Sequence, residues 1–214
     1  SFVRAASGLV LGGMVGAVEH AVRQREAGVD IVIAQGHEAG GHTGEITTMV
    51  LTPQVVDAMG AIPVLAAGGI ASGRQMAAAL ALGAEGVWCG SIWLTTVESD
   101  VPAETKRKLL RATSGDTVRT RSYTGKPARF LKSAWSEAWA TPGAPEPLMR
   151  PLQHFLSRPA TRRIERARAE SLMSTPIGQV AGQMHHELTV KQVYESMITE
   201  FANSAERISG LLEA

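Results

Sequence analysis

Cysteine is almost absent from this 214-residue sequence, which contains only Cys89. A single cysteine excludes an intrachain disulfide framework and any cysteine-rich zinc site, and it is typical of a reducing compartment. Aromatic residues are also scarce, at 5%. With 44% hydrophobic and 19% charged residues, the composition is nonetheless globular and excludes a disordered, collagenous or coiled-coil chain. We therefore expect a folded, cytoplasmic protein.

Long hydrophobic runs are missing as well. The longest uncharged apolar stretch near the start, residues 5–18, holds four glycines in 14 residues, whereas a membrane-spanning helix needs about 20 apolar residues. It is also a poor signal peptide, because only Arg4 precedes it. We therefore expect no membrane partner.

The net charge of +1 hides a division along the chain. Residues 1–100 contain 4 basic and 9 acidic residues, and residues 101–214 contain 17 basic and 11 acidic residues. This change in composition predicts two domains, residues 1–100 and a mainly helical region at 101–214.

The first half alternates signals for strands and helices. Apolar runs without polar alternation predict strands buried on both faces of a parallel sheet. They are residues 31–34, 63–67 and 86–89, with a weaker fourth at 8–15. Predicted helices lie between them: one over 17–27, one begun by Thr52-Pro53 and running to Met59, and one opened by a capping box of Ser72 and Gln75. Repeated βαβ units imply either a β/α barrel or an open doubly wound sheet.

Two glycine turns follow successive predicted strands. Gly68-Gly69 and Gly90-Ser91 leave bare backbone at the carboxyl ends of the strands, where parallel sheets bind ligands. The helix after Ser72 would also direct unpaired N–H groups at a ligand. Together these turns predict a phosphate site. The G-x-G-x-x-G spacing and a P-loop lysine are both lacking, which disfavours a Rossmann or Walker site.

The loop between the first two strands carries the candidate acid/base group. His42 follows Gly40-Gly41, and histidine is the side chain whose unperturbed pKa lies nearest neutrality. His37 and Glu38 could instead form a metal pair with His42 or Glu45. The spacing H-E-x-x-x-H has one residue too many for the helical zinc motif, so we expect no metal.

These residues resemble the nitronate monooxygenase family, formerly called 2-nitropropane dioxygenases, and the related flavin-containing bacterial enoyl-acyl-carrier-protein reductases. The resemblance rests on three ordered segments, 36–44, 62–70 and 83–91. Weaker likenesses lie at Thr124-Gly125-Lys126-Pro127-Ala128-Arg129 and at 176–182.

The resemblance implies an α/β fold, namely the C-terminal portion of an FMN-binding (β/α)8 TIM barrel with an appended mainly helical region. By that likeness Gly68, Gly69, Gly90 and Ser91 hold the FMN phosphate. Gly40 and Gly41 let their loop lie against the flavin, and Trp88-Cys89 pass nearby through the backbone. The family usually has Gly-Thr-Arg-Phe where this chain has residues 90–93, so one hydroxyl is kept and a cation is lost.

The implied activity is FMN-dependent oxidation of alkyl nitronates or nitroalkanes with O2, with His42 as the catalytic base. Two alternatives stay open: an NAD(P)H-dependent flavin reductase acting on enoyl thioesters or quinones, and a non-enzymatic half-barrel binding module. We expect small-molecule partners and no nucleic acid, with assembly into a homo-oligomer left open.

The second half carries two further helical patterns. An apolar stripe from Val190 to Leu212, opened by Thr189 and Gln192, predicts an amphipathic helix that packs on another element. A basic cluster could attract an acidic partner, although a solvated face partly paired with Glu165 and Glu170 is favoured. Its members are Arg158, Arg162, Arg163, Arg166 and Arg168. Trp135 and Trp139 are expected to cover the core, with the alternative that in a flavin enzyme they flank a substrate.

Overall fold

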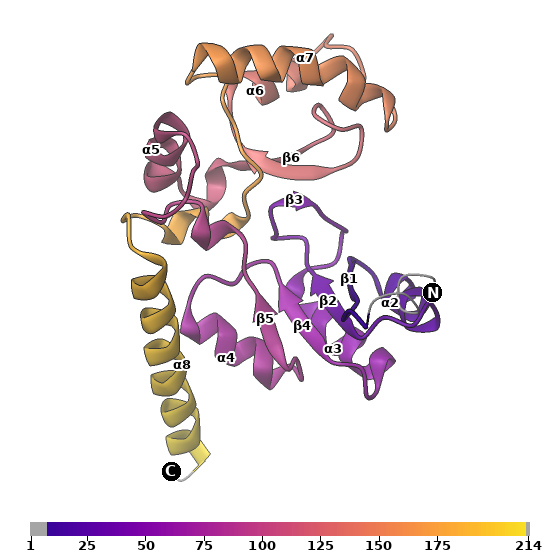
Figure 1. The fold of residues 1–214 in the computed structure, drawn as a ribbon, viewed down its shortest axis with the longest axis vertical. Coiled ribbons are helices and arrows are strands. Elements are labelled where there is room, and N and C mark those ends of the chain that lie inside the picture. Colours follow the sequence, from indigo (N-terminus) through magenta and orange to yellow (C-terminus); the bar gives the residue numbers. More distant parts are fainter. Residues whose placement is uncertain (1–7, 213–214) are drawn as a thin grey trace. The chain divides into compact units, whose positions relative to one another are not determined.

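The computed structural model describes residues 8–212, so residues 5–7 of the early apolar stretch lie outside the described part. Two compact units make up the chain (Figure 1). The first runs to Glu38 and adds Gly44–Cys89 and the segment from Lys191 onward; the second contains Ala39–Thr43 and Gly90–Val190. The sequence analysis predicted a single division near residue 100. The arrangement differs from it, because the short segment that carries His42 belongs to the second unit and the last helix belongs to the first.

A four-stranded parallel sheet forms the centre of the first unit (Figure 1). Its strands lie in the order β1-β2-β4-β5, and all neighbouring pairs are parallel. The strands are β1 (Gly12–Val15), β2 (Ile31–Gln35), β4 (Val64–Ala67) and β5 (Gly86–Trp88). All four predicted strands, including the weaker one near the start, are therefore confirmed as a parallel sheet.

Three helices pack against this sheet: α2 (Val18–Glu26), α3 (Thr48–Met59) and α4 (Gly73–Ala81). The last helix, α8 (Val190–Leu212), contacts the start of α4 at Gly73. The core between sheet, α2 and α3 includes Val32, Leu51 and Val55, none of which has any exposed surface. Burying one such side chain stabilises the fold by roughly 1.5–3 kcal/mol. A glycine with positive φ follows each of three helices, with φ of 83° at Gly28, 63° at Gly60 and 94° at Gly83.

The start of α3 corrects a sequence prediction. Thr52-Pro53 does not open the helix, which begins at Thr48 and contains Pro53 in its interior. The backbone N–H of Thr48, the first residue of α3, donates to Glu38 Oε2 at 2.9 Å. The capping acceptor thus comes from a loop ten residues earlier, beyond the reach of a local capping pattern, and burial of Leu51 and Thr52 favours the extra turn.

The second unit contains an antiparallel sheet that the sequence did not predict. Its order is β3-β7-β6, with β3 at Gly41–His42, β6 at Thr117–Thr120 and β7 at Ala128–Leu131. Helices α6 (Ala134–Ala140) and α7 (Leu152–Ala167) lie on the same side of β6 in Figure 1, and α5 (Ala103–Arg111) lies at one end. Short 3-10 helices occupy Ser91–Trp93, Ser114–Asp116 and Gln179–Gln183.

An aromatic stack fills the interior of this second unit. Tyr123 stacks on Phe130 with ring centroids 4.1 Å apart, and Trp135 lies 5.8 Å from Tyr123 and 6.0 Å from Trp139. The indole N–H of Trp135 donates to Ser122 Oγ at 3.2 Å. Both tryptophans are partly buried and pack against the aromatic cluster, in agreement with the prediction that they cover the core. Within residues 8–212, no helix has the length and apolar character needed to cross a bilayer.

Candidate functional site

His42 lies on β3, at the edge of the antiparallel sheet. Its backbone is in register with Ala128 of β7, and Gly41 is in register with Arg129. The side chain is exposed, so the imidazole is accessible to a small molecule. Two segments that resemble the same family in sequence, the Gly40-Gly41-His42 loop and the stretch from Thr124 to Arg129, are thereby brought side by side.

A side chain from that second segment holds the imidazole. Thr124 lies in the turn between β6 and β7, and its Oγ1 is 2.8 Å from Nε2 of His42. The same hydroxyl donates to the carbonyl of Lys126 at 3.3 Å and accepts from the Lys126 N–H at 3.4 Å. Thr124 lies in a segment that resembles the family in sequence, but the sequence analysis assigned it no role.

The surroundings of His42 favour its neutral form. Burial against the unit lowers the pKa of His42 from 6.5, and the positive charges of Arg150 and Lys126 lower it further. A neutral imidazole retains a lone pair and can accept a proton at neutral pH.

The turn at Gly68-Gly69 follows β4 in the first unit. Both glycines have positive φ, 92° and 73°, which other residues adopt only with strain. Thr48 Oγ1 lies within hydrogen-bond distance of the carbonyl oxygens of Ala67 and Gly68, at 3.2 and 2.9 Å. The same hydroxyl lies 3.0 Å from Glu38 Oε2. Glu38 and Thr48 therefore support the turn, and Glu38 has a structural role there.

Removal of Glu38 should destabilise the first unit. In Glu38→Ala the N–H of Thr48 at the start of α3 loses its acceptor, which costs about 1–2 kcal/mol and lowers the melting temperature by roughly 2–8 °C. Glu38→Gln keeps an oxygen acceptor and should retain most of the stability. Thermal unfolding followed by circular dichroism measures both variants, and equal melting temperatures for Glu38→Ala and the parent would contradict this role.

The N-terminus of α4 corrects another expectation. Ser72 does cap the helix, with its Oγ accepting from Gln75 N at 3.4 Å. The reciprocal half of the predicted capping box is not formed, because Gln75 Oε1 accepts from the Ala71 N–H and the Ser72 hydroxyl instead of the Ser72 N–H. The N–H of Gly73, however, donates to the carboxylate of Glu200 on α8 at 3.0 Å. Side chains of the first unit thus accept hydrogen bonds from the N–H groups of Gly73 and Gln75. These two N–H groups therefore do not point unpaired at a ligand. No local sequence pattern indicates the role of Glu200, which lies 127 residues away.

Gly90 and Ser91 stand at the start of the second unit. A Cβ at Gly90 would meet nothing within 4 Å, so open space lies above its Cα. Ser91 Oγ accepts from the backbone N–H of Gly178 at 2.9 Å. Its own proton remains available, because a hydroxyl both accepts and donates.

Gly40 and Gly41 differ in the space that surrounds them. A Cβ at Gly40 would come within 2.7 Å of the Ile177 backbone, so this glycine allows two segments of the second unit to pack closely. Gly41 has φ of 74° and nothing within 4 Å of where a Cβ would lie. Gly41 therefore has the open surface needed for contact with a planar ligand, and Gly40 has a structural reason to be glycine.

Trp88 and Cys89 end the first unit's sheet. Trp88 is 52% exposed at the end of β5. Burial raises the pKa of the Cys89 thiol to about 11, so the sulfur stays protonated at neutral pH. A protonated, part-buried thiol is a poor nucleophile, which limits Cys89 to packing and backbone contacts.

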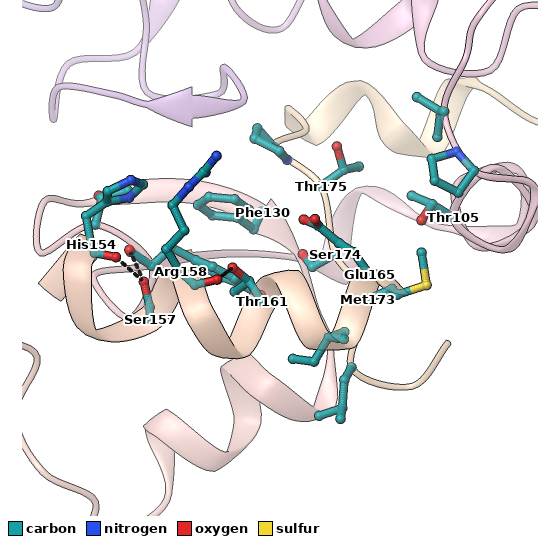
Figure 2. Close-up of a pocket in the computed structure, with 17 residues that line it drawn as sticks. Thr105, Phe130, His154, Ser157, Arg158, Thr161, Glu165, Met173, Ser174 and Thr175 are labelled. Atoms are coloured by element: carbon teal, nitrogen blue, oxygen red, sulfur yellow. Dashed lines mark hydrogen bonds between the residues drawn. The ribbon is translucent and has the colours of Figure 1, made fainter. Parts of the chain in front are cut away.

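A cavity of about 560 Å³ opens in the second unit (Figure 2). One wall is α7, with His154, Ser157, Arg158 and Thr161, and the facing wall includes Ser174 and Thr175. Phe130, Tyr123 and Thr124 also line it. Since Thr124 is hydrogen-bonded to His42, the cavity reaches the side chain that holds the imidazole. Sequence analysis did not predict it, because its lining comes from segments far apart along the chain.

The structure places the predicted site residues in two groups. The first unit holds Gly68, Gly69, Trp88 and Cys89, and the second holds Gly40, Gly41, His42, Gly90 and Ser91. Among residues 8–212, no three His, Cys, Asp or Glu side chains cluster as a metal ion would require.

Comparison with known proteins identifies relatives of the whole chain. The family model described as nitronate monooxygenase matches residues 2–200. A Mycobacterium tuberculosis protein named putative monooxygenase Rv1533 is 50% identical over 211 residues, which cover 96% of this chain and 56% of that protein. The chain thus spans a little more than half the length of this relative.

Solved structures share its fold. FabK from Thermotoga maritima is 36% identical with a TM-score of 0.85, over 98% of this chain and 66% of that one. Nitroalkane oxidase from Streptomyces ansochromogenes is 34% identical with a TM-score of 0.84, over 94% of this chain and 60% of that one. The predicted fold class is confirmed: the parallel sheet is a portion of a β/α barrel, and it carries an additional helical unit.

Proposed function

Because the chain belongs to the nitronate monooxygenase family, we propose that it is an FMN-dependent oxidoreductase. Its substrates are alkyl nitronates or nitroalkanes, O2 is the oxidant, and His42 is the catalytic base. Its single cysteine supports a reducing, cytoplasmic location.

The observation that carries this proposal is the environment of His42. An exposed imidazole that is held in place and kept neutral suits the removal of a proton from a carbon acid. Thr124 supplies the positioning at 2.8 Å. The pKa of His42, lowered by burial and by the cations Arg150 and Lys126, supplies the neutral state.

The hydrogen bonds of Thr124 also indicate which ring nitrogen acts. We propose that the Thr124 hydroxyl directs its proton to the Lys126 carbonyl at 3.3 Å and accepts from the Nε2–H of His42 at 2.8 Å. Nδ1 then carries the free lone pair and takes the proton that lies α to the nitro group. The imidazolium formed in this step remains hydrogen-bonded to Thr124.

The glycine turns fit the phosphate of FMN. Positive φ at Gly68 and Gly69, together with open space at Gly90, leaves backbone that a phosphate can approach closely. Ser91 retains a hydroxyl proton to donate. Gly41 offers an unobstructed backbone to the ring, and Trp88-Cys89 would contribute backbone alone. When bound, FMN supplies the electron transfer between nitronate and O2, while the chain's own residues bind, orient and move the proton.

Substitution of Ser91 tests the phosphate assignment. Ser91→Ala removes a hydroxyl donor to a charged group, and the FMN dissociation constant should rise about tenfold. Ser91→Thr keeps the hydroxyl and should bind FMN like the parent, which controls for the lost contact to Gly178. Fluorescence titration of the apoprotein with FMN measures all three proteins. Equal dissociation constants for Ser91→Ala and Ser91→Thr would remove Ser91 from the phosphate site.

The proposed activity is tested directly by oxygen consumption. Protein loaded with FMN should consume O2 when a preformed alkyl nitronate is added, without any nicotinamide. If oxygen is consumed only when NADPH is present, the nitronate oxidation proposed here is incorrect.

A second candidate function is an NAD(P)H-dependent flavin reductase. The specific observation in its favour is the cavity of about 560 Å³ in the second unit, which is larger than a small nitroalkane requires. Reduction of bound flavin by NADPH, rather than by nitronate, would distinguish this function.

A further inference from the structure

Four arginines line a groove of about 390 Å³ on one side of α7. Arg158, Arg162 and Arg166 recur every four residues, so their side chains emerge along one stripe of the helix at roughly 6 Å per step. Arg163 joins them in the groove, and all four arginines are exposed. This groove is defined here as the arginine groove.

Glu165 and Glu170 were expected to pair with this cluster, but within residues 8–212 neither forms an ion pair with an arginine of the groove. The carboxylate of Glu170 pairs with Arg107 at 3.6 Å, and Glu104 pairs with Arg168 at 3.7 Å. In residues 8–212, Arg158, Arg162 and Arg163 have no carboxylate within ion-pair distance. The basic face is therefore partly paired, but through Arg168 and Glu104 rather than through Glu165 and Glu170, and the groove keeps a concentrated positive charge.

An aromatic ring lies within the same groove. Phe155 lines it together with Pro159, and Phe155 is 70% exposed. An exposed aromatic face beside guanidinium groups can stack on a planar base while the guanidinium groups bind phosphate. Arginine binds phosphate, like carboxylate, through paired N–H donors, and several arginines in one row suit a ligand that carries more than one phosphate.

Arg158 joins this groove to the larger cavity. It lines both, and in Figure 2 it projects from α7 between His154 and Phe130. The larger cavity in turn reaches Thr124, which holds His42. A ligand with an anionic end in the arginine groove could therefore extend its other end toward the candidate catalytic histidine.

We propose that the arginine groove binds the phosphorylated adenosine diphosphate end of a co-substrate, with the adenine on Phe155 and the phosphates on Arg158, Arg162 and Arg166. Two common ligands share this chemistry: coenzyme A, which would carry the substrate as a thioester, and NADPH, which would supply electrons. The inference goes beyond the proposed function, because binding in this groove requires neither nitronate chemistry nor FMN.

Titration calorimetry with free coenzyme A and, separately, NADPH tests the proposal on the full chain. The variant Arg162→Gln/Arg163→Gln removes two charges from the groove and keeps good helix formers. Its affinity for the bound ligand should fall at least about tenfold. Phe155→Ala should weaken binding of the same ligand but leave any binding of inorganic phosphate unchanged.

A matched control removes the same amount of charge elsewhere. Lys191→Gln/Arg207→Gln changes two exposed cations on α8, and it should bind the nucleotide like the parent. Circular dichroism of each variant establishes that the fold is retained.

The titrations distinguish coenzyme A from NADPH as the ligand, and they also show whether the groove binds neither. Binding of coenzyme A alone assigns the groove to a substrate carrier, and binding of NADPH alone assigns it to an electron donor; binding of both supports the shared chemistry. No binding of either nucleotide, or equal affinity in parent and groove variant, overturns the proposal. Because the readout is binding, failure here leaves nitronate oxidation untouched, and a protein inactive on nitronates can still bind a nucleotide.

Discussion

His42→Ala is expected to lose the turnover of neutral nitroalkanes while it retains FMN. A positioned general base contributes about 10²- to 10⁴-fold, so kcat/KM for a neutral nitroalkane should fall within that range. A preformed nitronate has already lost the proton, and its oxidation should fall much less. The matched control is His37→Ala, which removes a neighbouring histidine that lies outside β3.

The pH dependence of kcat/KM tests the role of His42 independently. Burial, Arg150 and Lys126 lower the pKa of His42 below 6.5, so the folded protein keeps the neutral base at pH values where a free histidine is already protonated. The value of kcat/KM for a nitroalkane should rise with pH along a limb below 6.5 and be level at neutral pH. Equal losses on nitroalkane and nitronate in His42→Ala would remove His42 from the role of carbon-acid base.

Thr124→Val is expected to have the second largest effect on activity. Valine preserves the shape but removes the hydroxyl 2.8 Å from Nε2, so the imidazole loses its fixed orientation. Loss of a partner that orients a functional histidine costs about 10- to 100-fold in activity. The loss should appear in kcat for nitroalkanes and leave FMN affinity unchanged.

Thr124→Ser separates positioning from packing. Serine restores the hydroxyl without the methyl group, and it should recover most of the lost kcat and keep the acidic limb at its parental pH. If Thr124→Ser is as slow as Thr124→Val, the contribution of Thr124 is packing and the assignment of Nδ1 as the base loses its support.

The parallel sheet was predictable because its information is local. Runs such as Ile31–Ala34 and Val64–Ala67 are apolar on both faces, and glycines at fixed positions mark the helix ends. The start of α3 was not predictable in this way, since its acceptor comes from Glu38 in the preceding loop. The antiparallel sheet was missed because β3 has only two residues and pairs with β7, which lies more than eighty residues later.

The candidate site shows the same limit. His42 and the glycine turns stand in recognisable segments, so sequence alone named them. Thr124 and Glu200 act across long separations, 82 and 127 residues, on His42 and on Gly73. Contacts of this kind depend on how distant segments fold together, and no spacing rule within one segment predicts them.

The most direct test of the proposed function is the absorption spectrum of the purified, FMN-loaded protein during anaerobic addition of an alkyl nitronate and, separately, of NADPH. We predict a flavin band that the nitronate bleaches and that returns when O2 is admitted. A band bleached only by NADPH would contradict the nitronate assignment and favour the reductase. A protein that takes up no FMN would contradict the flavin site itself and leave a non-enzymatic binding module.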